Sequence, residues 1–239
     1  DKACFQLVVW NPEADEIIGG YRFTRWSMAT FHENGQPYVN TEHLFDFSQK
    51  FLDEYFPYCI EMARAFVQPK YQSAQAGRKA LFALDNLWDG IGGLVATDPS
   101  VKYLSGKVTI YSSSPELSRK AMIYYLDKHF GDREELITSK NPERWTDEQE
   151  EYFNEMFNGA NYKEDYQILN NYVKSFGDVI PPLIHSYIGL SETMKTFGTT
   201  FDPDFGDCYD TAMIITIADI YKEKYDRYIN SYFSEAEKA

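Results

Sequence analysis

Cysteine, histidine and long apolar runs are scarce in this sequence, and each scarcity excludes a class of protein. The 239 residues include three cysteines with no Cys-x-x-Cys pair, which argues against a structural zinc site and a disulfide framework. The four histidines, at positions 32, 43, 129 and 185, lack the spacing of metal ligands or of a catalytic triad. No apolar run could span a bilayer, so we expect a cytoplasmic protein with at most peripheral membrane contact.

Positive charge is scarce as well. Lysine and arginine number 23 against 37 acidic residues, which gives a net charge of −14. Nucleic acid is therefore excluded as a partner, because phosphate binding needs clustered cations. The acidic residues gather between positions 132 and 165, whereas Arg64, Lys70, Arg78 and Lys79 cluster in a different segment. That basic cluster marks a place where an anion can bind.

The apolar patterns predict a mixed sheet with helices packed on it. Strands are expected at residues 4–10, 17–25, 58–67, 101–111 and 209–217, the first two as an antiparallel hairpin. Helices are expected at 42–55, 77–97, 112–130 and 181–190, with a serine at 112–114 capping the third of them. Residues 132–179 are polar, acidic and helical in pattern, which indicates an insertion, and 202–206 read as a turn.

The segment 59–72 carries the most information about function. It begins as a strand with Glu61 and Arg64 near its middle, turns at Pro69, and continues into a polar segment that opens a long helix. Backbone N–H groups at the start of a helix bind anions, so Ser73, Gly77 and their neighbours form a candidate phosphate site. An ionisable pair just before such a site suggests group-transfer chemistry.

The order of elements, centred on this segment, resembles the GNAT acyltransferase fold. The more specific resemblance is to the branch of ornithine-lipid and N-acyl amino acid synthases, whose members are often labelled hemolysins. Residues 61–71, EMARAFVQPKY, are similar to the branch signature Glu-x-Gly-Arg-x-x-Val-x-Pro-x-Tyr. Further matching stretches are 8–22, 87–108 and 181–205. The resemblance implies a single GNAT-like α/β (α+β) domain over 1–239, with a mostly antiparallel sheet, helices on both faces and the acidic helical insertion at 132–179.

Three departures from the family pattern qualify this resemblance. The chain starts at what would be an internal strand, so the N-terminal part of the fold is expected to be missing. Ala63 stands where the signature has glycine. The turn at 73–79 lacks the Arg/Gln-x-x-Gly-x-Gly/Ala pattern of the best-known coenzyme A users, which disfavours acetyl-coenzyme A and is compatible with a donor on acyl carrier protein.

The resemblance also implies roles for the residues of the signature. Glu61 is the candidate general base for the acceptor amine, and Arg64 is the second candidate catalytic residue. A structural salt bridge between the two is the alternative. Residues three apart on a regular strand face opposite sides, so a bulge between them, as GNAT folds have, is expected. Tyr111 and Tyr124 are candidate acids for the leaving thiolate.

The donor is expected to be an acyl thioester, on acyl carrier protein or coenzyme A, that is not permanently bound. The bulge implies an open wedge in which the backbone of Ala65, Phe66 and Val67 binds a pantetheine arm. The residues expected to hold its phosphate are Ser73, Gly77, Arg78 and Lys79. Lys70, Arg78 and Lys79, with Arg119 and Lys120, form the expected docking patch for acyl carrier protein, which is acidic like this chain.

The predicted reaction is transfer of a fatty acyl group to the amine of a small amino acid, of ornithine or glycine type. In two alternatives the protein is also an enzyme: an acyl-homoserine-lactone-type synthase or an acyl-coenzyme A-dependent GNAT transferase. A third is a non-enzymatic, membrane-perturbing protein, as the hemolysin label implies. No basic amphipathic helix supports the third alternative.

Overall fold

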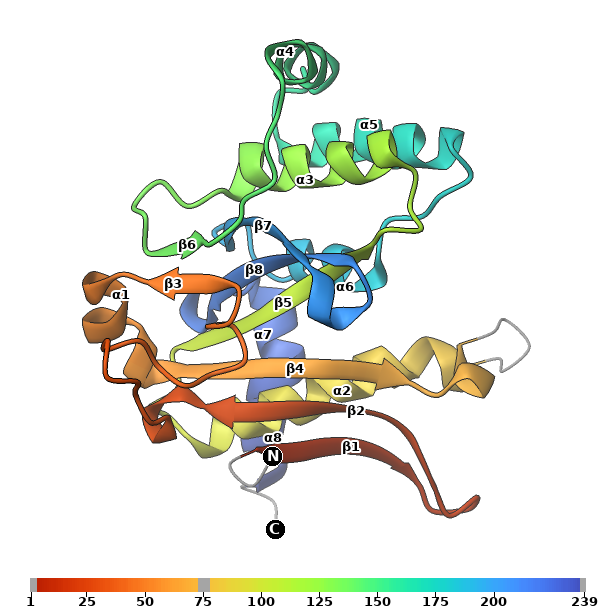
Figure 1. The fold of residues 1–239 in the computed structure, drawn as a ribbon. Coiled ribbons are helices and arrows are strands. Elements are labelled where there is room, and N and C mark those ends of the chain that lie inside the picture. Colours follow the sequence, from red (N-terminus) through yellow and green to blue (C-terminus); the bar gives the residue numbers. More distant parts are fainter. Residues whose placement is uncertain (1–3, 73–77, 237–239) are drawn as a thin grey trace.

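A six-stranded sheet forms the centre of the computed structural model, which describes residues 4–72 and 78–236 (Figure 1). The strand order is β1-β2-β4-β5-β8-β7. Every neighbouring pair is antiparallel except β4 and β5, which run parallel. The bounds are β1 (Phe5–Asn11), β2 (Glu16–Arg25), β4 (Cys59–Val67), β5 (Tyr103–Tyr111), β7 (Lys195–Asp202) and β8 (Cys208–Thr216). The predicted mixed, mostly antiparallel sheet and its opening hairpin are confirmed.

The two faces of the sheet are covered by different elements, because side chains alternate along each strand. On β8, Met213 and Ile215 join the large core with α2 (Arg78–Thr97) and α3 (Glu116–Phe130). Ala212 and Ile214 point into a second core formed by α1 (Gln49–Glu54), Trp26 and the small sheet of β3 (Phe45–Phe47) and β6 (Ile137–Ser139). Helices thus lie on both faces, as expected.

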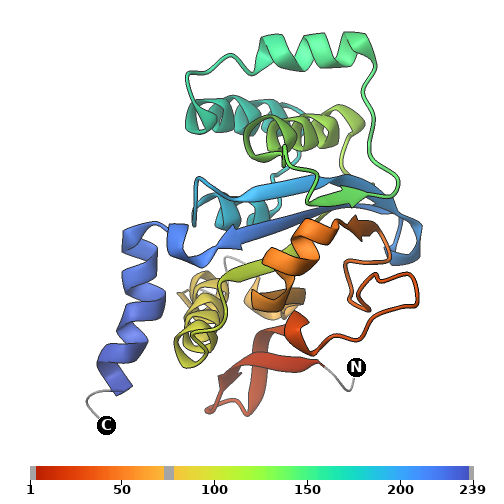
Figure 2. The same ribbon diagram turned by 90° about the vertical axis from the view of Figure 1, so that its left-hand side faces the viewer.

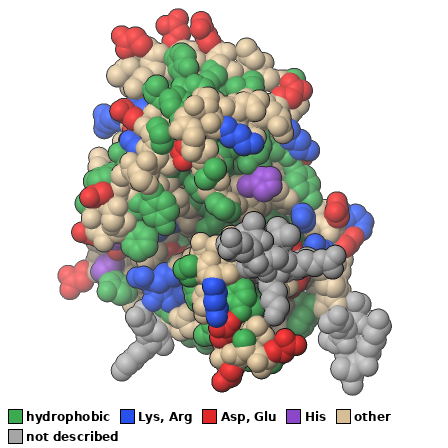
Figure 3. Space-filling view, turned by 90° about the vertical axis from the view of Figure 1, so that its right-hand side faces the viewer, with side chains coloured by type: hydrophobic (Ala, Val, Ile, Leu, Met, Phe, Trp, Pro, Cys, Tyr) green, Lys and Arg blue, Asp and Glu red, His purple; other side chains and the backbone are tan. Residues whose placement is uncertain are grey.

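Residues 132–179 extend the molecule away from the sheet. They contain β6 and two helices, α4 (Asp147–Met156) and α5 (Tyr162–Ser175). Helix α5 packs on α3, and α4 forms the outermost layer (Figure 2). Acidic side chains gather at the end of the molecule over α4 (Figure 3). The predicted helices are confirmed, whereas the strand β6 was not predicted. The division into one domain with an insertion stays a prediction.

Three local predictions were wrong or incomplete. Strand β7 was missed, because Gly198 and a run of threonines weaken its apolar alternation. The segment 42–55 contains a strand as well as a helix. The N-cap of α3 is Pro115, without a side-chain hydrogen bond, so the predicted serine cap is wrong. Besides several 3-10 turns, the described chain also contains α6 (Pro182–Ile188), α7 (Lys222–Tyr225), a π-helical turn (Asp226–Asn230) and α8 (Ser231–Ala236). In the described part of the chain no helix combines the length and apolarity needed to cross a membrane.

The contact between α2 and the π-helical turn depends on Gly92. A Cβ added at this position would lie 1.9 Å from the carbonyl oxygen of Tyr228, so the backbone itself would have to move. We therefore expect Gly92→Ala to lower the free energy of unfolding by about 1–3 kcal/mol. Gly93→Ala is the matched control: its Cβ would meet the Tyr232 ring at 3.3 Å. Helix propensity alone favours that alanine by about 0.5–1 kcal/mol, so urea denaturation showing equal losses for both variants would contradict this prediction.

Candidate active site

The site begins where β4 and β5 separate. Their parallel pairing covers only the first part of β4, from Cys59 opposite Tyr103 to Met62 opposite Gly106. Beyond that point β4 stays paired with β2, while β5 stays paired with β8 as far as Tyr111. The edges of β4 and β5 that face each other therefore have no partner strand in the described sheet. The predicted divergence of these two strands is confirmed.

A bulge in β4 lies directly after the separation. Gly20 of β2 pairs with Phe66, and Arg22 pairs with Ala63, so three steps on β4 correspond to two on β2. Arg64 absorbs the extra residue, with a φ of 51° in the left-handed region. Such a conformation is unfavourable for a residue with a Cβ, and it persists where surrounding structure fixes it, often at functional sites. The strand contains a bulge as expected, but its position differs: pairing is regular from Glu61 to Ala63, and the bulge lies at Arg64 itself instead of between Glu61 and Arg64.

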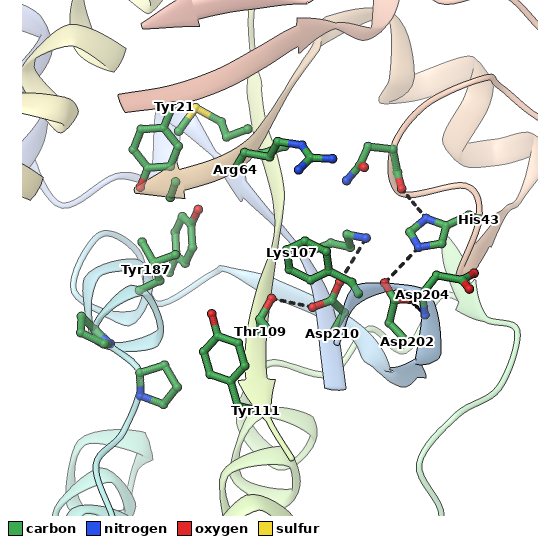
Figure 4. A pocket seen from close by; sticks show the side chains of 18 residues that line it. Tyr21, His43, Arg64, Lys107, Thr109, Tyr111, Tyr187, Asp202, Asp204 and Asp210 are labelled. Carbon is green, nitrogen blue, oxygen red and sulfur yellow. Dashed lines mark hydrogen bonds and ion pairs between the residues drawn. The ribbon is translucent and has the colours of Figure 1, made fainter. Parts of the chain in front are cut away.

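A pocket of about 430 Å³ fills the space between the separated strands (Figure 4). Arg64 and its neighbours on β4 form one wall, and Lys107, Thr109 and Tyr111 of β5 form another. The guanidinium of Arg64 is exposed to this pocket and has no hydrogen bond or ion pair with any described residue. The alternative reading of a structural salt bridge between Glu61 and Arg64 is therefore wrong, because Glu61 bonds to Trp26, Asn40 and Thr41 instead. An unpaired cation in a pocket is a ready partner for a carboxylate.

Carboxylates line the opposite side of the pocket. Asp210 of β8 is 3% exposed, accepts a hydrogen bond from Thr109 at 2.7 Å and pairs with Lys107 at 3.1 Å. Asp202, at the end of β7, lies 3.1 Å from Nε2 of His43. The pocket therefore presents an unpaired cation on one wall and buried, oriented carboxylates on the other. This arrangement suits a small zwitterion.

His43 links this side of the pocket to the segment that follows β2. Its Nδ1 lies 2.7 Å from the carbonyl oxygen of Asn40. A carbonyl only accepts, so Nδ1 carries the hydrogen and Nε2 faces Asp202. None of the four histidines was expected to take part in a site. The contact between His43 and Asp202 joins residues 159 positions apart, which no local sequence pattern reveals.

Glu61 lies behind the pocket instead of lining it. Its side chain is 3% exposed. The indole of Trp26 donates to it at 3.1 Å, the backbone N–H of Asn40 at 3.2 Å and the hydroxyl of Thr41 at 2.5 Å. Since the Asn40 carbonyl in turn accepts from His43, Glu61 holds the segment that brings His43 to Asp202. This geometry favours a positioning role for Glu61 over direct contact with a substrate amine.

The two candidate tyrosines have different surroundings. Tyr111 lines the pocket at its mouth and is exposed. Tyr124 instead packs against Trp145 and Phe157, in an aromatic cluster between α3 and α4. Burial raises the pKa of Tyr124 further from neutrality. The expectation that Tyr124 is an acid for the leaving thiolate is therefore wrong, because its ring does not reach the pocket.

The proposed donor residues are placed in part. Ala65 lines the pocket, and Phe66 and Val67 continue the free edge of β4 beyond it. Ser73 and Gly77 lie outside the described residues, as do the side chains of Arg78 and Lys79 at the start of α2. Lys70 forms an ion pair with Glu16.

Two residues of the expected docking patch are not on the surface. Arg119 is 9% exposed, with its guanidinium over the ring of Tyr209, 4.3 Å from the centroid. Lys120 is equally buried and donates to Gln149 at 3.0 Å. Both cations are engaged by α3 and its neighbours, so their predicted role in docking acyl carrier protein is wrong. Among the residues with described coordinates, no cluster of His, Cys, Asp and Glu could hold a metal ion.

Comparison with known proteins identifies a matching family and two similar proteins, all described as acetyl- or acyltransferases. The family described as "Acetyltransferase (GNAT) domain" matches residues 1–81. A protein of Phocaeicola vulgatus named glycine N(alpha)-acyltransferase is 46% identical over 235 residues, covering 98% of this chain and 72% of its own length. A protein of the same name from Bacteroides thetaiotaomicron is 46% identical over 227 residues, covering 95% and 67%.

A search of solved structures gives more distant neighbours. A crystal structure of an aminoglycoside 6'-N-acetyltransferase complexed with coenzyme A has 12% sequence identity and a TM-score of 0.37. The alignment covers 90% of this chain and 73% of that one.

Proposed function

The chain belongs to the GNAT acyltransferase family, and from this premise we propose that it transfers an acyl group from a thioester to the α-amine of glycine. Its membership rests on the two relatives that are 46% identical over nearly the whole chain. Members of this family are acyltransferases, so the alternative of a non-enzymatic, membrane-perturbing protein is rejected. Glycine is chosen over ornithine because both of these relatives carry glycine in their names.

Arg64 is the observation that carries this proposal. Its guanidinium lies in the pocket without a partner among the described residues, at the bulge where β4 leaves β5. A guanidinium can bind both oxygens of a carboxylate, which fixes the orientation of the acceptor. Asp210, which points into the pocket between Lys107 and Thr109 (Figure 4), is the proposed partner of the acceptor ammonium. An amino acid is thereby held at both of its charged ends.

The thioester is proposed to enter along the wedge between β4 and β5. The unpaired edge of β4 at Ala65, Phe66 and Val67 offers N–H and C=O groups that a pantetheine arm can bind as an added strand. We propose acyl carrier protein as the carrier, since the turn at 73–79 lacks the residue pattern of the best-known coenzyme A users. Coenzyme A remains the alternative carrier, with the same arm.

The reaction requires a deprotonated amine, a polarised carbonyl and close approach of the two. The amine nitrogen attacks the thioester carbon, the C–S bond breaks, and the thiolate leaves. Tyr111, exposed at the pocket mouth, is the proposed proton donor to the thiolate. Glu61, first considered as the base, is proposed to act through Asn40 and His43 by holding them in place.

The test of this function is an assay of thiol release coupled to mass spectrometry of the product. The protein is incubated with a long-chain acyl thioester, on acyl carrier protein or on coenzyme A, together with glycine or ornithine. We expect thiol release to depend on the amino acid, N-acylglycine to form, and the rate with glycine to exceed that with ornithine at least about tenfold. Thiol release that is independent of any amino acid would contradict the proposal.

A further inference from the structure

Two tyrosines meet at the closed end of the wedge. Tyr21 belongs to β2 and faces the bulge of β4, since it lies between the paired residues Gly20 and Arg22. Tyr187 belongs to α6, and both rings line the pocket. Figure 4 shows the rings approaching from opposite sides, with their hydroxyl ends at the gap between them. The two residues come from segments 166 positions apart and share no sequence pattern.

Neither hydroxyl has a hydrogen-bond partner among the described residues. Tyr21 is 2% exposed, and its hydroxyl oxygen is a buried polar atom left without a partner. Tyr187 is 5% exposed and likewise donates to no described acceptor. Buried polar groups in folded proteins are nearly always satisfied, and an orphan calls for an explanation. A buried hydroxyl without a partner, and a second unpartnered hydroxyl that faces it in the same pocket, are explained by a ligand oxygen that accepts from both.

The position of the hydroxyls identifies that oxygen. A Cβ added at Gly106 would lie 3.5 Å from the hydroxyl of Tyr187 and 3.0 Å from the carbonyl oxygen of Met62. Gly106 and Met62 are the last pair of β4 with β5, so the Tyr187 hydroxyl is next to the point where the strands part. An arm that enters from the open end of the wedge ends at this point. Its reactive end is the thioester carbonyl.

We propose that the hydroxyls of Tyr21 and Tyr187 bind the carbonyl oxygen of the donor thioester and stabilise the oxyanion that forms when the amine attacks. The inference rests on the proposed acyl transfer and assigns it an oxyanion site. As the C–N bond forms, the carbonyl π electrons move onto this oxygen. When the C–S bond breaks, they return to re-form the carbonyl, and the thiolate carries away the bonding pair. The proton lost from nitrogen goes to solvent.

Hydrogen bonding, and not proton transfer, is the role that suits these two phenols. Burial raises the pKa of Tyr187 to about 12. Burial and the neighbouring Tyr187 raise the pKa of Tyr21 as well. A thiol has an ordinary pKa near 8.5, so phenols that hold their protons this tightly would not give them to the leaving thiolate. They remain donors throughout the reaction, as an oxyanion site requires.

The test uses Tyr21→Phe, Tyr187→Phe and the double variant. Each single change is expected to lower kcat by about 10–10²-fold and the double change by about 10²–10³-fold, with the KM for glycine unchanged. Tyr125→Phe is the matched control. Tyr125 is fully buried outside the pocket, and its hydroxyl donates to the Tyr162 carbonyl at 2.9 Å. Tyr125→Phe should lower the melting temperature and preserve kcat. Tyr21→Phe should preserve the melting temperature, because the Tyr21 hydroxyl has no described hydrogen-bond partner to lose.

Two further measurements separate this inference from the proposed acceptor. Hydroxylamine replaces glycine as a small acceptor that needs no carboxylate site. Binding of an acyl-pantetheine ketone is compared with that of its methylene counterpart, which lacks only the oxygen. We expect the parent to prefer the ketone about fivefold to tenfold, and the double variant to lose that preference. If the double variant loses kcat with hydroxylamine while the parent does not turn over glycine, the proposed glycine acceptor is refuted and the oxyanion site stands. A double variant within twofold of the parent in kcat, or an unchanged ketone preference, would overturn the oxyanion site.

Discussion

Replacing Arg64 by glutamine is expected to raise the KM for glycine by about 10²-fold and to leave the KM for the acyl donor nearly unchanged. A hydrogen-bonded contact to a charged group contributes about 1.5–3 kcal/mol, and 1.4 kcal/mol corresponds to a factor of ten. Arg64 has no internal partner among the described residues, so its loss leaves no buried carboxylate unpaired. The effect should therefore appear in acceptor binding and not in stability.

Matched variants separate charge from geometry at this position. Arg64→Lys keeps the positive charge and loses the planar pair of donors, so its KM for glycine should fall between those of the parent and Arg64→Gln. Arg144→Gln removes an exposed arginine outside the pocket and should change neither KM, which controls for the general loss of positive charge. A glycine KM within about threefold of the parent in Arg64→Gln, alongside a raised donor KM, would place Arg64 on the thioester instead of the acceptor.

The part of the site carried by one continuous segment could be predicted from the sequence. The apolar strand, the proline turn and the following helix all belong to residues 58–97, and local patterns determine them. The separation of β4 from β5 was expected from the family resemblance. The bulge came from the family resemblance, because nothing in the residues around Arg64 demands a positive φ. The position of the bulge directs the Arg64 side chain into the pocket. The spacing of Glu61 and Arg64 alone did not determine that direction.

The rest of the site could not be predicted, because its members are joined only by the fold. His43 and Asp202 meet across the sheet, and Asp202 ends a strand that was not expected. That strand, β7, contains Gly198 at a φ of 81°, beside an irregularity in its register with β8. Glycine and a broken register remove the alternation from which strands are recognised. The turn predicted at 202–206 is present, with Asp202 capping it, but the strand that leads into it was missed, so the sequence did not place Asp202 beside the pocket.

Glu61 provides the prediction with the largest expected effect on stability. In Glu61→Ala, three donors lose their acceptor: the Trp26 indole, the Asn40 N–H and the Thr41 hydroxyl. Each buried donor left unsatisfied costs about 1–3 kcal/mol, and water entering the cavity recovers part of this. We expect the free energy of unfolding to fall by about 3–5 kcal/mol, and activity to fall with it, because His43 loses its support. Urea denaturation monitored by tryptophan fluorescence measures the first effect.

Glu61→Gln distinguishes a positioning residue from a general base. The amide oxygen can still accept from Trp26 and Asn40, which both bond to Oε2. The amide nitrogen can donate to the Thr41 hydroxyl, which accepts as well as donates. The network survives with weaker, uncharged hydrogen bonds, so we expect a loss of about 1–2 kcal/mol in stability and less than about tenfold in kcat. A general base would lose about 10²–10⁴-fold in kcat with the fold intact. Such a loss in Glu61→Gln, with near-parental stability, would return Glu61 to the role of proton acceptor, acting through a water that reaches it from the pocket.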